Sequence, residues 1–324
     1  MKFNFWNKIS RPILVSAPMS GITDASFRFM LAKYGKPDVI FTEFVSCDGL
    51  CSDGKERLLK QLIYNKSEKP IVAQLFGSKP ENFYKSALIC KKLGFDGIDI
   101  NMGCPDKSVV KQESGSSLIK DPFLAGKIIE ATRKGAGNLP VSVKTRLGYS
   151  QIDMEKWINY LLKFSLDALT IHGRTKKQGY GGEANWEKIG HVKTLAKEIS
   201  PETLIIGNGD VKTLDDAYLK VKKYDLDGIM IGRALIANPL FFKKTRQMKD
   251  LSIRERFDML LEHIKIFEEV FRDDNRNFSD MKKFYKSYIS DFKGASALRF
   301  ELMKARNGEE IKDIVENFLN EFGS

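Results

Sequence analysis

Short runs of apolar, often β-branched residues recur along the first three quarters of the chain, and longer segments of mixed character separate them. Runs of this length with turn residues at their ends are typical of buried strands. The separating segments repeat their apolar residues at helical spacing, and three of them begin with a proline that suits a first helical turn: Pro80, Pro122 and Pro239. The eight candidate strands cover residues 13–19, 39–45, 70–77, 97–103, 141–148, 168–174, 204–210 and 228–233.

Eight strands alternating with helices within about 240 residues predict an α/β fold, a closed parallel (β/α)₈ TIM barrel. An open, doubly wound sheet is the alternative. That fold commonly opens its first helix with a G-x-G-x-x-G turn, whereas the first strand here is followed by "SGITD" at residues 20–24. We therefore favour the barrel.

The pattern changes near residue 250, where β-rich runs end. Apolar residues then recur at three- and four-residue intervals, as in Phe257, Leu260, Leu261, Ile264 and Phe267. This spacing predicts a bundle of three or four helices, with a loop at residues 272–281. We expect two domains, a catalytic barrel at residues 1–245 and a C-terminal helical-bundle domain at residues 250–324.

The 324 residues are 42% hydrophobic, as in globular proteins. No apolar run approaches the roughly 18 residues needed to cross a bilayer, so we expect a cytoplasmic protein that does not bind a membrane. Four cysteines and three scattered histidines show no metal-ligand spacing, so we predict neither a disulfide scaffold nor a metal site. The sequence implies no protein partner, and we expect a monomer.

Basic residues outnumber acidic ones by 53 to 42, and the net charge of +11 favours a polyanionic partner such as nucleic acid. Residues 1–240 hold nearly all of this excess, with 36 basic against 26 acidic groups. Residues 281–306 in the near-neutral tail hold seven basic and two acidic groups. Taken alone, such a run is typical of a solvated helix face.

Polar and special residues gather where the predicted strands end. Barrels of this kind form their active sites at the carboxyl ends of the strands, so these residues are candidate site residues. The turns Asn208-Gly209-Asp210 and Gly232-Arg233 follow the last two strands, where barrels commonly bind a phosphate. The other ends hold Pro18, Met19, Ser20, Glu43, Gln74, Asn101, Lys144, Arg146, His172 and Arg174.

Two of these side chains have the chemistry to face a redox-active ring. Gln74 can both donate and accept hydrogen bonds, and Lys144 would stabilise an anionic reduced flavin. A strand-end ion pair is the alternative for Lys144. For His172 the alternative to a cofactor contact is a hydrogen-bonded structural role.

Cys104 lies past the end of the fourth strand, between Gly103 and Pro105. It can be a buried space-filler, a metal ligand or a reactive thiol, and by residue type alone a free cysteine is more often a small buried side chain. Its place on the catalytic face favours a reactive role. Because a thiol with a pKa of about 8.5 is mostly protonated at neutral pH, it can act as a general acid.

An ordered set of motifs along the chain resembles the tRNA-dihydrouridine synthases, and "NMGCP" followed by Val109, Gly115 and Leu118 is the most specific part. The matching segments run through the whole barrel, and the helical tail stands where this family has one. They are "APMSGITDASFR" (17–28), "TEFVS" (42–46), "QLFGS" (74–78), "GFDGIDINMGCPDKSVVKQESGSSL" (94–118), "VSVKTRLG" (141–148), "LTIHGRTKKQGYGG" (169–182), "GNGDV" (207–211) and "GIMIGRALIANPLFF" (228–242).

The resemblance implies an FMN-dependent oxidoreductase that reduces the C5–C6 double bond of particular uridines in tRNA, with NADPH as the electron donor. By matching position it implies that Cys104 protonates C5, that Asn101 lies beside the base, and that Arg174 lies near the flavin phosphate or RNA. It implies a cofactor site made of Pro18, Met19, Ser20, Gln74, Lys144, His172, Asn208, Gly209, Asp210, Gly232 and Arg233.

Under this resemblance the basic and aromatic residues of the tail are expected to bind RNA, and the candidates are Lys282, Lys283, Lys286 and Arg299. Two other functions stay open. One is an FMN barrel that reduces a small molecule, as dihydroorotate dehydrogenase-like enzymes do, and the basic excess and the added helical domain disfavour it. The other is a non-catalytic RNA-binding barrel, which the full set of strand-end residues disfavours.

Overall fold

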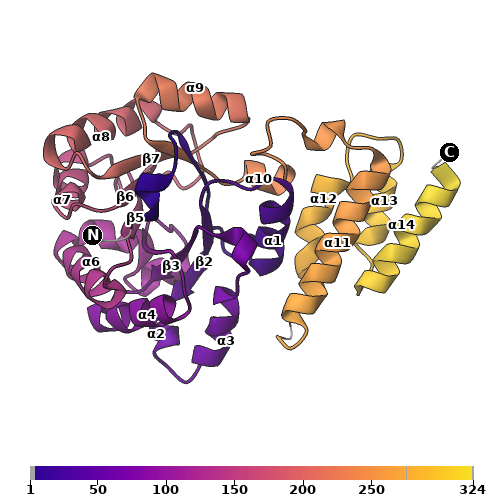
Figure 1. The fold of residues 1–324 in the computed structure, drawn as a ribbon, viewed down its shortest axis with the longest axis horizontal. Coiled ribbons are helices and arrows are strands. Elements are labelled where there is room, and N and C mark those ends of the chain that lie inside the picture. Colours follow the sequence, from indigo (N-terminus) through magenta and orange to yellow (C-terminus); the bar gives the residue numbers. More distant parts are fainter. Residues whose placement is uncertain (1–3, 275, 323–324) are drawn as a thin grey trace.

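The first part of the chain is an eight-stranded sheet rolled into a barrel (Figure 1). The structure, a computed structural model, describes residues 4–274 and 276–322. All neighbouring strands are parallel, in the order β1-β8-β7-β6-β5-β4-β3-β2, and a parallel bridge between Val15 and Val39 joins the two edges. The predicted (β/α)₈ barrel is confirmed. Its strands are β1 (Ile13–Ser16), β2 (Ile40–Ser46), β3 (Ile71–Phe76), β4 (Gly97–Met102), β5 (Val141–Arg146), β6 (Ala168–His172), β7 (Leu204–Asn208) and β8 (Gly228–Ile231).

The interior of the barrel is apolar at one end and polar at the other. Val72, Ile206 and Met230 belong to one buried apolar cluster inside the ring of strands. Gln74 follows Val72 by two residues and Asn208 follows Ile206 by two, so each points to the same inward face of its strand. The inward positions therefore become polar toward the carboxyl ends of the strands.

Outer helices begin where the sequence supplies a cap. The Asp24 carboxylate accepts a hydrogen bond from the backbone N–H of Phe27 (3.0 Å), and the Thr213 hydroxyl accepts one from Asp216 (3.1 Å). The long outer helices are α1 (Ala25–Tyr34), α4 (Pro80–Lys92), α6 (Pro122–Ala136), α8 (Trp186–Ile199) and α9 (Leu214–Tyr224). Short ones are α2 (Cys47–Leu50), α3 (Lys55–Leu59), α5 (Lys107–Lys111), α7 (Asn159–Leu162) and α10 (Ala234–Ala237).

The chain then leaves the barrel and forms the helical bundle that the spacing after residue 250 predicts. Ser252 and Glu255 make a reciprocal capping box at its first helix. The bundle packs against α1 (Figure 1), where the ring of Phe27 stacks on that of Phe284 with centroids 5.3 Å apart. Its helices are α11 (Ile253–Phe271), α12 (Tyr285–Tyr288), α13 (Ala295–Leu302) and α14 (Gly308–Phe322).

Two expectations about local structure differ from the structure. The helix expected to begin at Pro239 is wrong: the segment forms turns, in which the Gln247 side chain donates to the carbonyls of Leu240 and Lys243, and Leu240, Phe241 and Phe242 are buried. The loop expected at residues 272–281 ends in a 3₁₀ helix. The 3₁₀ helices are η1 (Phe5–Lys8), η2 (Lys60–Leu62), η3 (Lys66–Glu68), η4 (Gly115–Lys120), η6 (Met248–Asp250) and η7 (Phe278–Phe284), and η5 (Met154–Ile158) is a π-helical turn before α7.

Candidate active site

A cavity of about 1080 Å³ opens at the carboxyl ends of the strands. The strand-end residues predicted from the sequence that line it are Pro18, Met19, Lys144, Arg146, His172, Arg174, Asn208, Gly209, Asp210, Gly232 and Arg233. Three further candidates lie beside the cavity: Gln74 on β3, Asn101 on β4 and Cys104 just after β4. Ser20 is exposed in the turn after β1. Most of the candidate residues predicted from the sequence therefore lie around one cavity.

Other lining residues were not foreseen, and two of them had a visible signal. Tyr180 is 65% exposed in the glycine-rich segment "KKQGYGG" after β6. Thr213 is the N-cap of α9, a residue type typical of a helix start. Lys212 and Lys220 also line the cavity, and nothing in their spacing separated them from other surface lysines.

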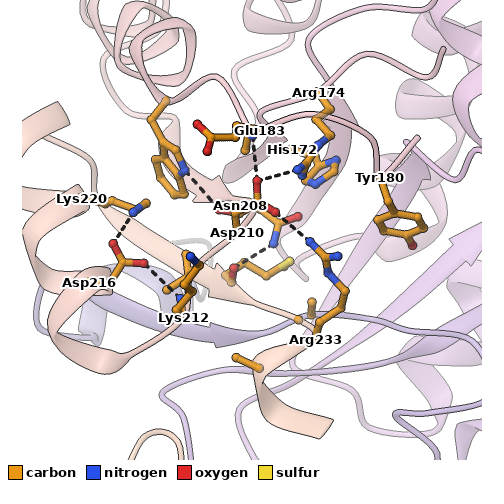
Figure 2. Close-up of a pocket in the computed structure, with 18 of the residues that line it drawn as sticks. His172, Arg174, Tyr180, Glu183, Asn208, Asp210, Lys212, Asp216, Lys220 and Arg233 are labelled. Atoms are coloured by element: carbon orange, nitrogen blue, oxygen red, sulfur yellow. Dashed lines mark hydrogen bonds and ion pairs between the residues drawn. The ribbon is translucent and has the colours of Figure 1, made fainter. Parts of the chain in front are cut away.

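Asp210 organises two arginines at the end of the cavity formed after β7 and β8 (Figure 2). Its carboxylate accepts hydrogen bonds from Arg174 (2.6 Å) and Arg233 (2.7 Å), and also from the backbone N–H of Ala184 (2.8 Å). Partial burial alone would raise the pKa of Asp210, but these hydrogen bonds and the two positive charges hold it below its ordinary value. The carboxylate thus orients cations, and the cations face the cavity.

Arg174 has one nitrogen left over for a ligand. The side chain is only 2% exposed, and besides Asp210 it donates to the carbonyls of Gly181 and Gly182. Its Nη1 atom is buried without a hydrogen-bond partner among the described residues. A buried, unpaired guanidinium nitrogen at the wall of a cavity is a strong site for an anion.

The turn after β7 requires glycine. Gly209 has a φ of +129°, and a Cβ there would lie 2.7 Å from the Cβ of Ala184. The neighbouring Asn208 donates from Nδ2 to the carbonyl of Met230 (2.8 Å), and Trp186 donates from Nε1 to the carbonyl of Gly209 (3.1 Å). The segment therefore approaches β6 and β8 closely and is held rigidly.

Lys144 and His172 face the cavity from β5 and β6. Burial and the nearby charge of Arg146 lower the pKa of Lys144 to about 8, and no described residue forms an ion pair or hydrogen bond with its Nζ atom. Burial, with Lys144 and three arginines nearby, puts the pKa of His172 well below its ordinary value, so its imidazole is neutral. The ion pair that was the alternative for Lys144 is thus absent from the described part of the chain.

Gln74 and Asn101 bond to each other beside the cavity. Asn101 donates from Nδ2 to the Gln74 carbonyl oxygen Oε1 (3.0 Å). Its own Oδ1 accepts the backbone N–H groups of Gly103 (3.1 Å) and Cys104 (2.9 Å). Asn101 therefore fixes the turn that carries the thiol.

Cys104 is half-buried in that turn, and burial raises the pKa of its thiol. Arg146 donates to the carbonyl of Gly103 (2.7 Å), and the N–H of Ser116 donates to the carbonyl of Cys104 (3.0 Å). Gly115 has a φ of +60°, and a Cβ there would lie 2.8 Å from Val109 Cγ1. The turn is thus anchored from three sides, with a thiol that stays protonated at neutral pH.

The donor set around the cavity fits a flavin with a phosphate group. Arg174 and Arg233 supply positive charge at one end, half-buried Lys144 has no hydrogen-bond or ion-pair partner among the described residues, and the neutral His172 lies between them along the strand ends. No group of three His, Cys, Asp or Glu side chains within residues 4–274 and 276–322 is arranged to bind a metal ion.

The comparisons with known proteins agree with this chemistry. A family model described as dihydrouridine synthase matches residues 15–322, almost the whole chain. The chain belongs to the dihydrouridine synthase family. The predicted family and enzyme class, an oxidoreductase with a flavin cofactor, are thereby confirmed.

Curated relatives of this dihydrouridine synthase match over nearly their full length. "Probable tRNA-dihydrouridine synthase 2" of Bacillus subtilis (strain 168) is 39% identical over 320 residues, 98% of this chain and 97% of the relative. "Probable tRNA-dihydrouridine synthase" of Staphylococcus aureus (strain MRSA252) is also 39% identical over 320 residues, with 98% and 96% covered.

Solved structures that resemble this dihydrouridine synthase are more distant. Morphinone reductase has a TM-score of 0.53 at 13% identity, covering 72% of this chain and 84% of that chain. Histamine dehydrogenase from Rhizobium sp. 4-9 has a TM-score of 0.54 at 15% identity, covering 78% and 48%. At such low identity the likeness shows the barrel fold alone.

In this dihydrouridine synthase the basic residues proposed for the tail do not line the cavity. Lys286 is exposed, Lys282 donates to the carbonyl of Met303, and Arg299 donates to the carbonyl of Ile289 (2.6 Å). Lys283 reaches across to the barrel and donates to the carbonyl of Gly21, directly after Ser20. Three of the four cations thus have partners within the chain.

Proposed function

We propose that this dihydrouridine synthase binds FMN and, with NADPH as electron donor, reduces the C5–C6 double bond of particular uridines in tRNA. The observation that carries the proposal is the anchored Cys104 turn beside a cavity whose walls present buried cations. When bound, FMN would supply the hydride for C6 of the uracil.

The residues of the chain divide the cofactor between the two ends of the cavity. Arg174 and Arg233, oriented by Asp210, would hold the phosphate, and the backbone of Asn208, Gly209 and Gly232 would allow it to approach closely. Lys144, Gln74 and His172 would face the ring, where the positive charge of Lys144 favours the reduced, anionic form. Pro18, Met19 and Ser20, after β1, would line the remaining side.

Cys104 would give the proton to C5 of the uracil. Because burial raises the pKa of its thiol, the group is protonated at neutral pH and can act as a general acid. Asn101 would lie beside the base. Its Oδ1 holds the Cys104 turn by accepting hydrogen bonds from the backbone N–H groups of Gly103 and Cys104. A base inside folded RNA cannot reach this site, so the target uridine must turn out of its stack.

The helical bundle at residues 250–324 would bind the tRNA outside the pocket, with Lys286 and Lys283 as exposed cations and Lys282 and Arg299 nearby in the same segment. We expect the enzyme to act as a monomer in the cytoplasm, where its substrate occurs. No helix among the described residues is long and apolar enough to span a membrane.

The test is a substrate comparison with FMN-loaded protein and NADPH. We expect dihydrouridine in an unmodified tRNA transcript and no reduction of free uridine, orotate or an enone. Reduction of the small molecules and not of tRNA would instead support a small-molecule reductase. Tight tRNA binding by a protein that stays colourless after incubation with FMN would support a non-catalytic RNA-binding barrel.

A further inference from the structure

A buried carboxylate on β4, Asp99, is connected to the turn of Cys104 by a continuous chain of hydrogen bonds. Asp99 accepts from the Ser142 hydroxyl (2.6 Å) and from Gln74 Nε2 (2.7 Å). Gln74 Oε1 in turn accepts from Asn101, whose Oδ1 accepts the N–H of Cys104. Asp99 and Gln74 are fully buried, and Asn101 is nearly so.

The order of the strands makes this chain possible. Gln74 on β3 is directly opposite Asp99 on β4, and Asp99 is opposite Ser142 on β5. Asp99 and Asn101 are two residues apart on one strand, so they share its inward face. The hydrophobic neighbours Ile98 and Ile100 point the other way, into the core between strands and helices.

The chemistry of Asp99 fixes the direction of every bond in the chain. An ionised carboxylate only accepts hydrogen bonds, so Gln74 must turn its NH₂ group toward Asp99 and its oxygen toward Asn101. Asn101 must then turn its NH₂ group toward Gln74, which leaves its oxygen for the backbone N–H groups of Gly103 and Cys104. Burial raises the pKa of Asp99 to about 6, with the bonds from Ser142 and Gln74 and the charge of Lys144 opposing it, so the group is ionised at neutral pH.

We propose that Asp99 is a positioning residue, which sets the orientation of the Gln74 and Asn101 amides and thereby holds the Cys104 turn in its working geometry. It acts through these two amides and need not touch the substrate. The proposal rests on the proposed function only in naming Cys104 as the proton donor. The link from Asp99 to the turn is a property of the flavin-free protein and is testable without turnover.

The first test measures alkylation of Cys104 in flavin-free protein by iodoacetamide, followed by peptide mass spectrometry. Replacing Asp99 by leucine removes the acceptor, frees the Gln74 and Asn101 amides to turn, and loosens the thiol turn. We expect Cys104 to be alkylated at least fivefold faster in Asp99→Leu, while half-buried Cys51, at the C-cap of α2, serves as the internal reference. An unchanged Cys104 rate in folded protein would overturn the proposal.

Asp99→Asn covers the case in which the leucine variant does not fold. Asparagine has the same shape and keeps one oxygen acceptor, but no longer forces one orientation, so we expect a Cys104 rate between those of the wild type and the leucine variant. A rate equal to that of the wild type would count against the proposal. Asp227→Asn is the matched control, because Asp227 is an equally buried aspartate at the opposite ends of the strands, where it binds Lys193 (2.6 Å) and the N–H of Ile205 (2.8 Å). It should leave the Cys104 rate unchanged.

A double-variant cycle tests whether the effect passes through Asn101. Asn101→Ala removes the last link, so adding Asp99→Leu to it should change the Cys104 rate by less than twofold. Independent, multiplying effects would show that Asp99 acts by another route and would overturn the chain.

In turnover with tRNA we expect Asp99→Asn to lower kcat about tenfold, with KM for tRNA changed less than threefold. If tRNA is not a substrate at all, the proposed function fails while the alkylation results still decide the role of Asp99.

Discussion

Arg276 joins the helical bundle to the barrel, and its replacement is the sharpest test of how the two parts depend on each other. It donates to Asp24 (2.9 Å) and to Glu43 (3.4 Å), and its guanidinium lies 4.2 Å from the ring centre of Phe271. Glu43 also accepts the backbone N–H of Gly21, in the turn after β1. Arg276→Met keeps most of the packing and removes the positive charge that pairs with both carboxylates.

The size of the effect follows from burial. The side chains of Asp24 and Glu43 are 1% and 6% exposed, and that of Arg276 is 18% exposed. Removing one partner of a buried ion pair costs about 3–5 kcal/mol, and the partial exposure of Arg276 points to the lower end, roughly 3 kcal/mol. With an unfolding entropy of about 2.1 cal/mol/K per residue, this corresponds to a fall in Tm of about 4 °C.

The dependence on pH gives a second measurement. Burial, and next the charge of Asp24, raise the pKa of Glu43, so the native state binds a proton more readily than the unfolded chain. Glu43 therefore costs stability when ionised, and this cost disappears as the pH falls through its raised pKa. Since Arg276 offsets the cost, the deficit of Arg276→Met should be largest at pH 7 to 8 and smaller at pH 5.

Thermal unfolding of the flavin-free protein, followed by circular dichroism at several pH values, measures both effects. Arg272→Met replaces an exposed arginine at the C-cap of α11; it is the control and should change stability by less than about 0.5 kcal/mol. A Tm within 1 °C of the wild type for Arg276→Met, or a deficit that grows as the pH falls, would refute the reasoning.

Three further predictions concern the site and the tail. Cys104→Ala should keep flavin and tRNA binding but lower uridine reduction by about 10²–10⁴-fold, the usual contribution of a general acid; single-turnover measurements with reduced enzyme would reveal an unchanged rate if this role is wrong. Lys144, with a pKa of about 8, should be labelled by an amine reagent in flavin-free protein with a midpoint near that pH, since the neutral amine reacts and its fraction rises with pH. Bound FMN should protect it, and equal labelling with and without FMN would place the cofactor elsewhere. Lys286→Glu should weaken tRNA binding and reduce the salt slope by about one, with the flavin spectrum unaltered; titrations at several salt concentrations that match the wild type would remove Lys286 from the RNA surface.

The fold was predictable because its signals are local and repeated. Each strand is a short β-branched run with a polar end. Helix starts such as Pro80 and Asp121-Pro122 can each be recognised from a few neighbouring residues, without knowledge of the rest of the chain. The expected helix at Pro239 failed for a nonlocal reason. Its apolar residues have helical spacing in part, but Leu240, Phe241 and Phe242 are all required by the core between barrel and bundle.

Part of the candidate site was predictable because the carboxyl ends of all strands in a parallel barrel lie on the same face, so polar residues at those ends come together. Gln74, Lys144 and His172 follow from that rule together with the motifs. Asp99 was missed because a carboxylate in the middle of an apolar strand has no local signal; its role depends on which residues the register places opposite it. The same holds for Arg276, whose partners Asp24 and Glu43 are more than 230 residues away in the sequence.

Helix α1 has apolar neighbours on two sides, since it covers the barrel and also receives Phe284 and His263 from the tail (Figure 1). Phe27 is fully buried, and the rings of Phe284 and His263 lie against it. A gene truncated near residue 250 would therefore expose a hydrophobic stripe and leave Asp24 without its cation. The tail therefore cannot be exchanged freely between barrels. A replacement domain would have to supply apolar side chains that cover Phe27 on α1 and a cation that pairs with Asp24.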